Sequence, residues 1–329
     1  MFQQPIFAAE RDPTGLAALR HVVDAETGGG YRSFRRSLVP DYRRVKRDLA
    51  LGYGALAATL LLAGLAAGPL AGLAAAAVAA VAVGYWIAFL QLFIHEAAHY
   101  NLAPGRDAND RLADRLICWQ VGTSIAAYRR THAEHHRALG RAQDTETSYT
   151  HRLTLRFLVE MVTGVHAARV FLARRRTPQP SEPAGERGAA APLLKGIAAH
   201  LLILAGLLAL GAWPAALAWI GGVGVFFPLF ATVRQLLEHR PTRAALHLAD
   251  GDGDGAVTRL FGDGPFARTF GGAGFNRHLL HHLEPQISYT RLAELETYLM
   301  TTSAAPALDA RRSSYGRTFL ELLGDGARG

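Results

Sequence analysis

The stretch LALGYGALAATLLLAGLAAGPLAGLAAAAVAAVAVGYWIAFLQLFI, residues 49–94, contains no Asp, Glu, Lys or Arg in 46 residues. A helix of roughly 20 apolar residues spans a bilayer, so this stretch is long enough for two crossings. AAGPLAG at 66–72 interrupts it near the middle, and Pro and Gly in a helical pattern indicate a turn. The sequence therefore predicts two antiparallel membrane helices, at 50–67 and 71–94.

A second stretch, 196–233, is also free of these four residue types and carries only His200 as an ionisable side chain. GAWPAA at 211–216 divides it, which predicts membrane helices at 193–211 and 214–233. A buried helix of a soluble protein could imitate one such segment, but two uncharged blocks of this length are typical of membrane proteins. We therefore expect an all-α polytopic membrane protein with four transmembrane helices in two hairpins.

Basic residues decide the predicted orientation. Seven Lys and Arg side chains lie between Arg32 and Arg47, whereas neither tight turn contains one. Because Lys and Arg accumulate on the cytoplasmic side, we expect both termini and a histidine-rich helical cap in the cytoplasm. Anionic lipid headgroups, not nucleic acid, then explain the net charge of +8. The expected order is a cytoplasmic lead-in at 1–48, a hairpin at 49–94, a cytoplasmic segment at 95–192, a second hairpin at 193–233 and a cytoplasmic segment at 234–329.

Four shorter segments outside the hairpins have distinct patterns. RLADRLICWQVGTSIAAYRR, 111–130, has charged ends and an apolar middle too short to cross, and predicts a membrane-surface or re-entrant helix. Residues 153–172 predict another surface helix, and the Pro-rich 174–192 is typical of a flexible linker. DGDGDG at 250–255 resembles a calcium loop, but Phe261 stands where an EF-hand needs Glu, so we do not expect calcium.

Eight of the 14 histidines fall in three clusters, HEAAH at 95–99, HAEHH at 132–136 and HLLHH at 278–282. Residues three and four apart share a helix face, so the histidines of one cluster are expected to point the same way. An even number of predicted crossings separates each pair of clusters, which places all three on one side of the membrane. A proton relay would need only one or two histidines, and chance explains two H-x-x-H-H motifs poorly. The predicted metal ligands are His95, His99, His132, His135, His136, His278, His281 and His282.

This number of imidazoles exceeds the three or four ligands that zinc usually takes and favours two metal ions. His239, at the end of the fourth predicted helix, is the expected ninth ligand, and Asn276 could hold a water or orient a ligand. Nearby carboxylates could accept hydrogen bonds from the imidazoles and fix their orientation. The candidates are Glu96, Glu134, Asp144, Glu146 and Glu238.

The three clusters, in this order, resemble the histidine boxes HxxxH, HxxHH and HxxHH of the membrane fatty-acid desaturase superfamily. HAEHHRALGRAQDTE at 132–146 resembles the second-box run, in which Gly and an acidic pair follow the histidines. FNRHLLHHLEPQISYTRLAEL at 275–295 resembles the third-box run, with its preceding Asn and following Pro, Tyr and Arg-Leu. The chain departs from the family at Leu280, where an acidic residue often precedes the paired histidines. This departure bears on the substrate more than on the metal.

The resemblance implies an O2-dependent di-iron enzyme that desaturates a lipid or fatty-acyl chain held in an apolar channel. A hydroxylase or ketolase of a lipid, alkane or carotenoid is the alternative, because the same oxidant can insert oxygen. A metal transporter, the remote alternative, needs ligands near the bilayer midplane, which only His200 approaches. Zinc could replace iron in a purified sample.

The electrons for such a reaction are expected to come from outside the chain. Cys118 is the single cysteine, and the sequence contains neither a c-type haem motif nor a dinucleotide fingerprint. We therefore expect an external donor of the ferredoxin, rubredoxin or cytochrome type, together with its reductase.

Overall fold

The computed structural model describes residues 16–166, 169, 190–249 and 255–327. The predicted linker at 174–192 and the Gly/Asp loop at 250–255 lie almost entirely outside the described residues. Within them the chain is helical, and the single β-bridge joins Leu260 and Arg312. The predicted all-α class is confirmed.

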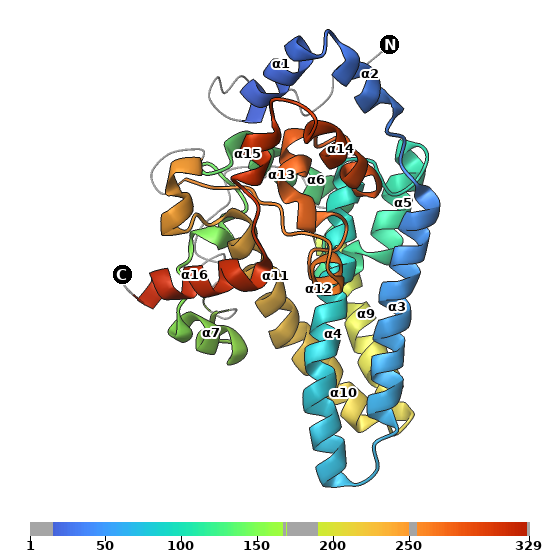
Figure 1. Cartoon of the computed structure of the whole chain (residues 1–329). Helices are drawn as coiled ribbons and strands as arrows, with labels where there is room; N and C mark the ends of the chain where they lie inside the picture. The colour runs from blue at the N-terminus through green and yellow to red at the C-terminus, as the bar shows by residue number, and fades with distance from the viewer. Residues whose placement is uncertain (1–15, 167–168, 170–189, 250–254, 328–329) are drawn as a thin grey trace.

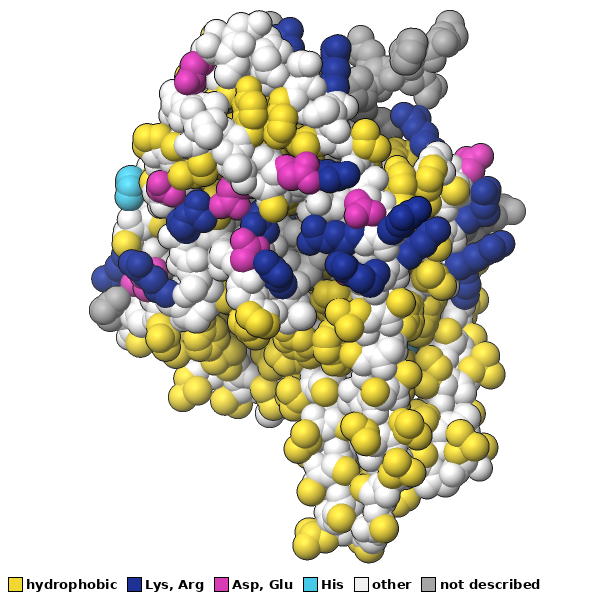
Figure 2. Space-filling model, turned by 45° about the vertical axis from the view of Figure 1, so that its right-hand side comes forward, with side chains coloured by type: hydrophobic (Ala, Val, Ile, Leu, Met, Phe, Trp, Pro, Cys, Tyr) yellow, Lys and Arg dark blue, Asp and Glu magenta, His cyan; other side chains and the backbone are white. Residues whose placement is uncertain are grey.

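A stalk of apolar helices projects from a larger helical cap (Figure 1). The stalk consists of α3 (Tyr42–Gly64), α4 (Pro69–Ala98), α9 (Ala190–Ala209) and α10 (Trp213–Gly221). Its outer surface is apolar, with Leu62, Leu70 and Leu202 each at least 70% exposed. Figure 2 shows apolar side chains over the stalk, below a band of Lys, Arg, Asp and Glu side chains. Such a surface is suited to lipid.

Three helices are long and apolar enough to cross a membrane, namely Pro69–Ala98, Ala190–Ala209 and the continuous helix Trp213–His239. They correspond to three of the four predicted membrane helices. The remaining prediction, 50–67, lies mostly within α3, which begins earlier, in the basic stretch after Asp41, and is not among these three. α3 still packs along α4, where a Cβ added to Gly52 would lie 2.7 Å from the side chain of Leu90.

The last membrane helix contains a π-helical segment, η3 (Gly222–Phe226), between α10 and α11 (Phe227–His239). The N–H of Phe227 bonds to the carbonyl of Gly222, five residues back, and the next residue, Pro228, has no N–H to donate. The segment crosses α4 at Gly84, where an added Cβ would lie 2.4 Å from the Cβ of Phe226. The missing side chain at Gly84 thus allows α11 to approach α4 closely.

The predicted surface helix at 111–130 is divided into α5 (Arg106–Leu116), η1 (Cys118–Val121) and α6 (Ile125–Ala138). The break occurs because Gly122 is left-handed, with φ 63°, and Ser124 starts a new helix by accepting a hydrogen bond from the N–H of Ala127. The second predicted surface helix, 153–172, is represented by α7 (Leu155–Val162).

The cap is completed by short helices from both ends of the chain. The N-terminal α1 and α2 pack over the third histidine cluster, where the buried Glu284 accepts a hydrogen bond from Tyr31 and pairs with Arg20 and Arg35. The remaining elements are α1 (Leu16–Glu26), α2 (Gly30–Ser37), η2 (Thr147–Thr150), η4 (Arg243–Leu248), α12 (Pro265–Phe270), η5 (Phe275–Arg277), α13 (His278–Leu283), η6 (Tyr289–Arg291), α14 (Leu292–Leu299), α15 (Ala305–Asp309) and α16 (Tyr315–Ala327).

Candidate metal centre

The cap-side ends of two membrane helices supply the first three histidines. α4 carries His95 in its last turn and His99 directly after it, and α11 ends on His239. Both helices run from the stalk into the cap, so their ends reach the same layer (Figure 1). All three side chains are buried.

Two cap helices supply the other six histidines. The second half of α6 carries three of them, and the six-residue helix α13 carries three more. These residues are His132, His135, His136, His278, His281 and His282. The structure therefore brings together all nine histidines that the sequence indicated.

The nine imidazoles form two adjacent groups. The first, called the α4 group, contains His95, His99, His132, His136 and His281, each with one ring nitrogen within 4.8 Å of the others. The second, called the α11 group, contains His135, His239 and His282, which meet the same criterion, together with His278. The two groups touch where the ring centroids of His136 and His282 lie 4.6 Å apart.

The spacing between ring nitrogens fits coordination of a shared ion. His132 Nε2 lies 3.0 Å from His99 Nε2 and 3.0 Å from His136 Nε2. In the α11 group, His278 Nε2 lies 2.9 Å from His239 Nε2 and 3.2 Å from His282 Nε2. Two nitrogens bound about 2.1 Å from one ion and at right angles are separated by about 3 Å. The observed separations match this geometry.

Several ring nitrogens in these groups also lack another partner. Neither nitrogen of His95 makes a hydrogen bond to any described residue, and the Nδ1 atoms of His239, His278 and His281 are likewise buried without one. A buried polar atom without a partner costs free energy, which an ion bound to His95 would offset. The residues present therefore fit two metal ions.

The charge state of the imidazoles is suitable for ligation. Burial, followed by the neighbouring histidines, holds the pKa values of His136, His278, His281 and His282 well below the ordinary value. These side chains are therefore neutral at neutral pH, and neutral imidazole is the form that binds a metal.

Asp144 and Glu146 orient two of the ligand imidazoles. Asp144 Oδ1 lies 2.8 Å from His135 Nδ1, and Glu146 Oε1 lies 3.1 Å from His132 Nδ1. Burial would lower the pKa of His135, but Glu146 and Asp144 outweigh it and raise this pKa. The hydroxyl of Tyr149 donates to the second oxygen of Asp144. A carboxylate on one ring nitrogen directs the other nitrogen toward the metal and increases its basicity.

Arg129 holds the end of α4 against α6. Its guanidinium donates to the carbonyls of Ala97 and Ala98, at 3.2 and 3.0 Å, and pairs with Asp110. It also lies 4.0 Å from the ring centroid of Tyr100, whose φ is 63°. Because Arg129 belongs to α6, this contact links the helices that carry the first two histidine clusters.

Arg259 caps the carbonyls at the end of α11, as Arg129 does at the end of α4. The buried side chain donates to the carbonyls of Leu237 and Arg240, at 2.8 and 2.6 Å. Its own backbone carbonyl accepts the N–H of Leu279 in α13 at 3.1 Å. Arg259 therefore links the helix that carries His239 to the third cluster. Neither arginine could be predicted from the sequence, because capping across such a distance leaves no local pattern.

Among the other four predicted residues, Glu96 comes within 3.8 Å of an imidazole, that of His95, which is beyond hydrogen-bond distance. Glu134 points outward and pairs with Arg137, and Asn276 donates to the carbonyl of Gly262. Glu238 pairs with Arg234 at 2.7 Å, and Glu96 accepts the N–H of Tyr289 at 3.1 Å. The structure brings neither Glu134 nor Asn276 to an imidazole.

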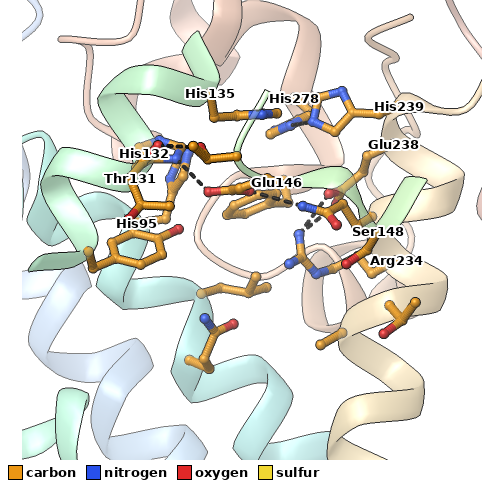
Figure 3. Close-up of a pocket in the computed structure, with 18 residues that line it drawn as sticks. His95, Thr131, His132, His135, Glu146, Ser148, Arg234, Glu238, His239 and His278 are labelled. Carbon is orange, nitrogen blue, oxygen red and sulfur yellow. Dashed lines mark hydrogen bonds and ion pairs between the residues drawn. The ribbon is translucent and has the colours of Figure 1, made fainter. Parts of the chain in front are cut away.

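A cavity of about 290 Å³ lies on the stalk side of the histidines, between α4, α6 and α11. Figure 3 shows His95, His132, His135, His239 and His278 around it, with Glu146 at the centre and the Arg234–Glu238 pair opposite His132. Apolar walls come from Leu92, Ala231 and Phe275, but most of the lining residues are polar. The expected apolar channel is thus not what the structure shows beside the histidines.

Comparison with known families identifies the family of the chain. The family model described as "Fatty acid desaturase" matches residues 71–314, a range that contains all nine histidines. The chain belongs to the fatty acid desaturase family. No individual curated protein matches it significantly. Membership in this desaturase family, together with the apolar helices, makes the protein an integral membrane oxidoreductase.

Proposed function

We propose that the protein is a di-iron desaturase that uses O2 and two external electrons to introduce a C=C bond into the alkyl chain of a lipid. The observation that carries this proposal is the pair of adjacent histidine groups within a fatty acid desaturase family domain. In the reaction two C–H bonds break and one C=C bond forms. O2 takes up these two hydrogens with two electrons and two protons, which leaves two molecules of water.

The chain's own residues would hold the metals, orient their ligands and keep bulk water away from them. The α4 group would hold one iron and the α11 group the other, and imidazole nitrogen suits iron. When bound, the two irons would supply the oxidising power that an unactivated C–H bond requires. Asp144 and Glu146 keep His135 and His132 oriented, and the surrounding helices bury the ligands away from bulk water.

The cavity on the stalk side of the histidines would hold the reacting part of the substrate. It adjoins both groups, because His95 and His132 on one side and His135 and His239 on the other line it. A substrate that enters from the lipid around the stalk would bring a C–H bond to the histidine layer. Positioning of this kind, more than tight binding, selects which bond reacts.

We further propose that the cap faces the cytoplasm. The basic residues of 32–47 lie beside the cap end of α3, as the positive-inside tendency requires. The electrons would come from a ferredoxin, rubredoxin or cytochrome that docks on this basic face, since the chain has a single, buried cysteine.

Lipid mass spectrometry of cells with and without the expressed protein tests the proposal. A desaturase yields lipids that have lost two hydrogens, and the His281→Ala variant yields none. Products that have instead gained an oxygen atom would show that the reaction is hydroxylation and not desaturation. The absence of any new lipid in the presence of a competent electron donor would refute the proposal.

A further inference from the structure

Three helices place a polar side chain one turn before a histidine that lines the cavity. The sequences are QLFIH at 91–95 on α4, YRRTH at 128–132 on α6 and QLLEH at 235–239 on α11. Residues four apart share a helix face, so Gln91, Tyr128 and Gln235 lie about one turn of 5.4 Å from their histidines. All three polar side chains line the same cavity. Together they form a polar layer beside the metal ligands.

The charged groups of the cavity are already engaged with one another. Glu146 accepts hydrogen bonds from Gln235 at 3.0 Å and contacts His132 at 3.1 Å. Glu238 pairs with Arg234 through both carboxylate oxygens, at 3.0 and 2.7 Å. The guanidinium of Arg234 also lies 4.3 Å from the ring centroid of Phe275. These contacts occupy the charged groups of Glu146, Glu238 and Arg234, so these groups are poorly available to a ligand.

The groups that remain available are neutral. The amide of Gln91 and the hydroxyls of Tyr128, Ser148 and Thr232 line the cavity, and none of them makes a hydrogen bond to a described residue through its side chain. The ring of Tyr128 stacks on His132 at 5.5 Å with an angle of 9°, which fixes the direction of its hydroxyl. Gln91 is the only Gln, Asn, Ser, Thr or charged residue of the described α4 helix before its histidine turn. An amide at this place in a membrane helix is stabilised by a hydrogen-bonding partner, which a ligand in the cavity can supply.

We propose that this layer binds a neutral hydrogen-bonding group of the lipid substrate, a hydroxyl or an amide. Gln91 can donate to and accept from either group, and the hydroxyl of Tyr128 adds a second contact. A free carboxylate fits less well, because it would lie beside Glu146 and Glu238 while Arg234 is already paired. The inference rests on the proposed function and specifies its substrate class: the reacting carbons lie a few methylenes from the polar group.

A binding measurement without turnover tests this assignment. The protein, as purified in detergent and kept under argon without an electron donor, is equilibrated with hexadecanamide or with hexadecane. The retained ligand is then quantified by mass spectrometry after gel filtration. We expect preferential retention of the amide. Gln91→Leu and Tyr128→Phe should each lower amide retention roughly two- to tenfold, the range for one lost hydrogen bond, and leave alkane retention unchanged.

Tyr85→Phe provides the matched control, because Tyr85 lies on α4, bonds to Thr269 and does not line the cavity. It should retain the amide as the wild type does. Equal retention of amide and alkane by the wild type, or unchanged amide retention in the Tyr128→Phe variant, would overturn the proposal. This readout needs no metal chemistry. A protein that prefers the amide to the alkane but forms no desaturated lipid would therefore refute the desaturase function and leave the binding proposal intact.

Discussion

The cap-side ends of α4 and α11 are built alike but stabilised differently. Each carries the pattern Gln-x-x-x-His, and each has its last carbonyls capped by a buried arginine from a different element. At α4 the arginine, Arg129, is paired with Asp110 and lies against Tyr100. At α11 the arginine, Arg259, has only carbonyl oxygens as its hydrogen-bond partners among the described residues, and burial lowers its pKa to about 10.

The difference shows how histidines from separate helices are held in one layer. A helix that enters the cap from a membrane can slide or tilt unless its end is fixed. Arg129 itself belongs to another histidine helix, whereas Arg259 is bonded through its backbone to one. Arg129 fixes α4 to α6, and Arg259 fixes α11 to α13. We therefore expect the α4 group to depend chiefly on Arg129 and the α11 group on Arg259.

The largest effect is expected when one ligand is removed from each group. His281→Ala should empty the α4 group and His135→Ala the α11 group, because each loses one of its imidazoles. Both variants should lose turnover completely while inserting normally into the membrane, and metal analysis should find about one iron where the wild type has two.

His166→Ala and His247→Ala serve as controls for this pair, since neither histidine lies in a group. Full iron content and activity in the His281→Ala variant would show that the groups are assigned wrongly.

A smaller effect is expected from the capping arginines. Arg129→Met removes two hydrogen bonds to α4 and leaves Asp110 without its arginine, which should destabilise the protein by about 2 to 3 kcal/mol. Arg259→Met also removes two hydrogen bonds, but it eliminates a buried charge that forms no salt bridge with a carboxylate among the described residues, so the expected cost is about 1 kcal/mol.

Thermal unfolding of the two arginine variants gives the order of these costs, and Arg129→Lys, which keeps the charge, should recover part of the loss. The comparison between the helix ends fails if Arg259→Met proves the more damaging change.

The carboxylates that orient the imidazoles should contribute less than the ligands. Asp144→Asn acts on His135 in the α11 group, and Glu146→Gln acts on His132 in the α4 group. Loss of such a carboxylate typically lowers metal affinity or activity by about 10- to 100-fold. Iron titration should show this loss in each variant, whereas Glu134→Gln, on the outward face of α6, should bind iron normally.

The smallest predicted effect concerns the hydroxyl of Tyr149, which reaches the imidazoles through Asp144, while the ring of Tyr149 stays against His239. Tyr149→Phe removes one hydrogen bond to this carboxylate and should weaken iron binding at the α11 group by roughly two- to tenfold. An effect as large as that of Asp144→Asn would indicate that Tyr149 contributes directly to the metal site.

The sequence was sufficient for the parts of the fold that local periodicity governs. Uncharged runs predicted three helices that the structure has. Helical spacing placed the histidines of each cluster on one helix, but the structure divides the second and third clusters between the two groups: His135 is apart from His132 and His136, and His281 is apart from His278 and His282. The position of His239 at the end of an apolar helix also singled it out in the sequence, and the structure places it beside His135 and His282.

Features that depend on distant contacts could not be predicted in this way. Glu134 and Asp144 both lie near the second cluster, but Glu134 projects outward from α6, whereas the turn after Gly140 returns Asp144 to His135. Arg129 and Arg259 look like ordinary surface charges until the helix ends that they cap are in place. Gln91 did leave a signal, as a lone amide in an apolar run.

The most direct test of the central claim is the metal content of the purified protein after reconstitution with ferrous iron under argon, combined with X-ray absorption. We predict two irons per chain, with first neighbours dominated by imidazole nitrogen at about 2.1 Å. One iron or none per chain, or a first shell dominated by oxygen, would contradict it.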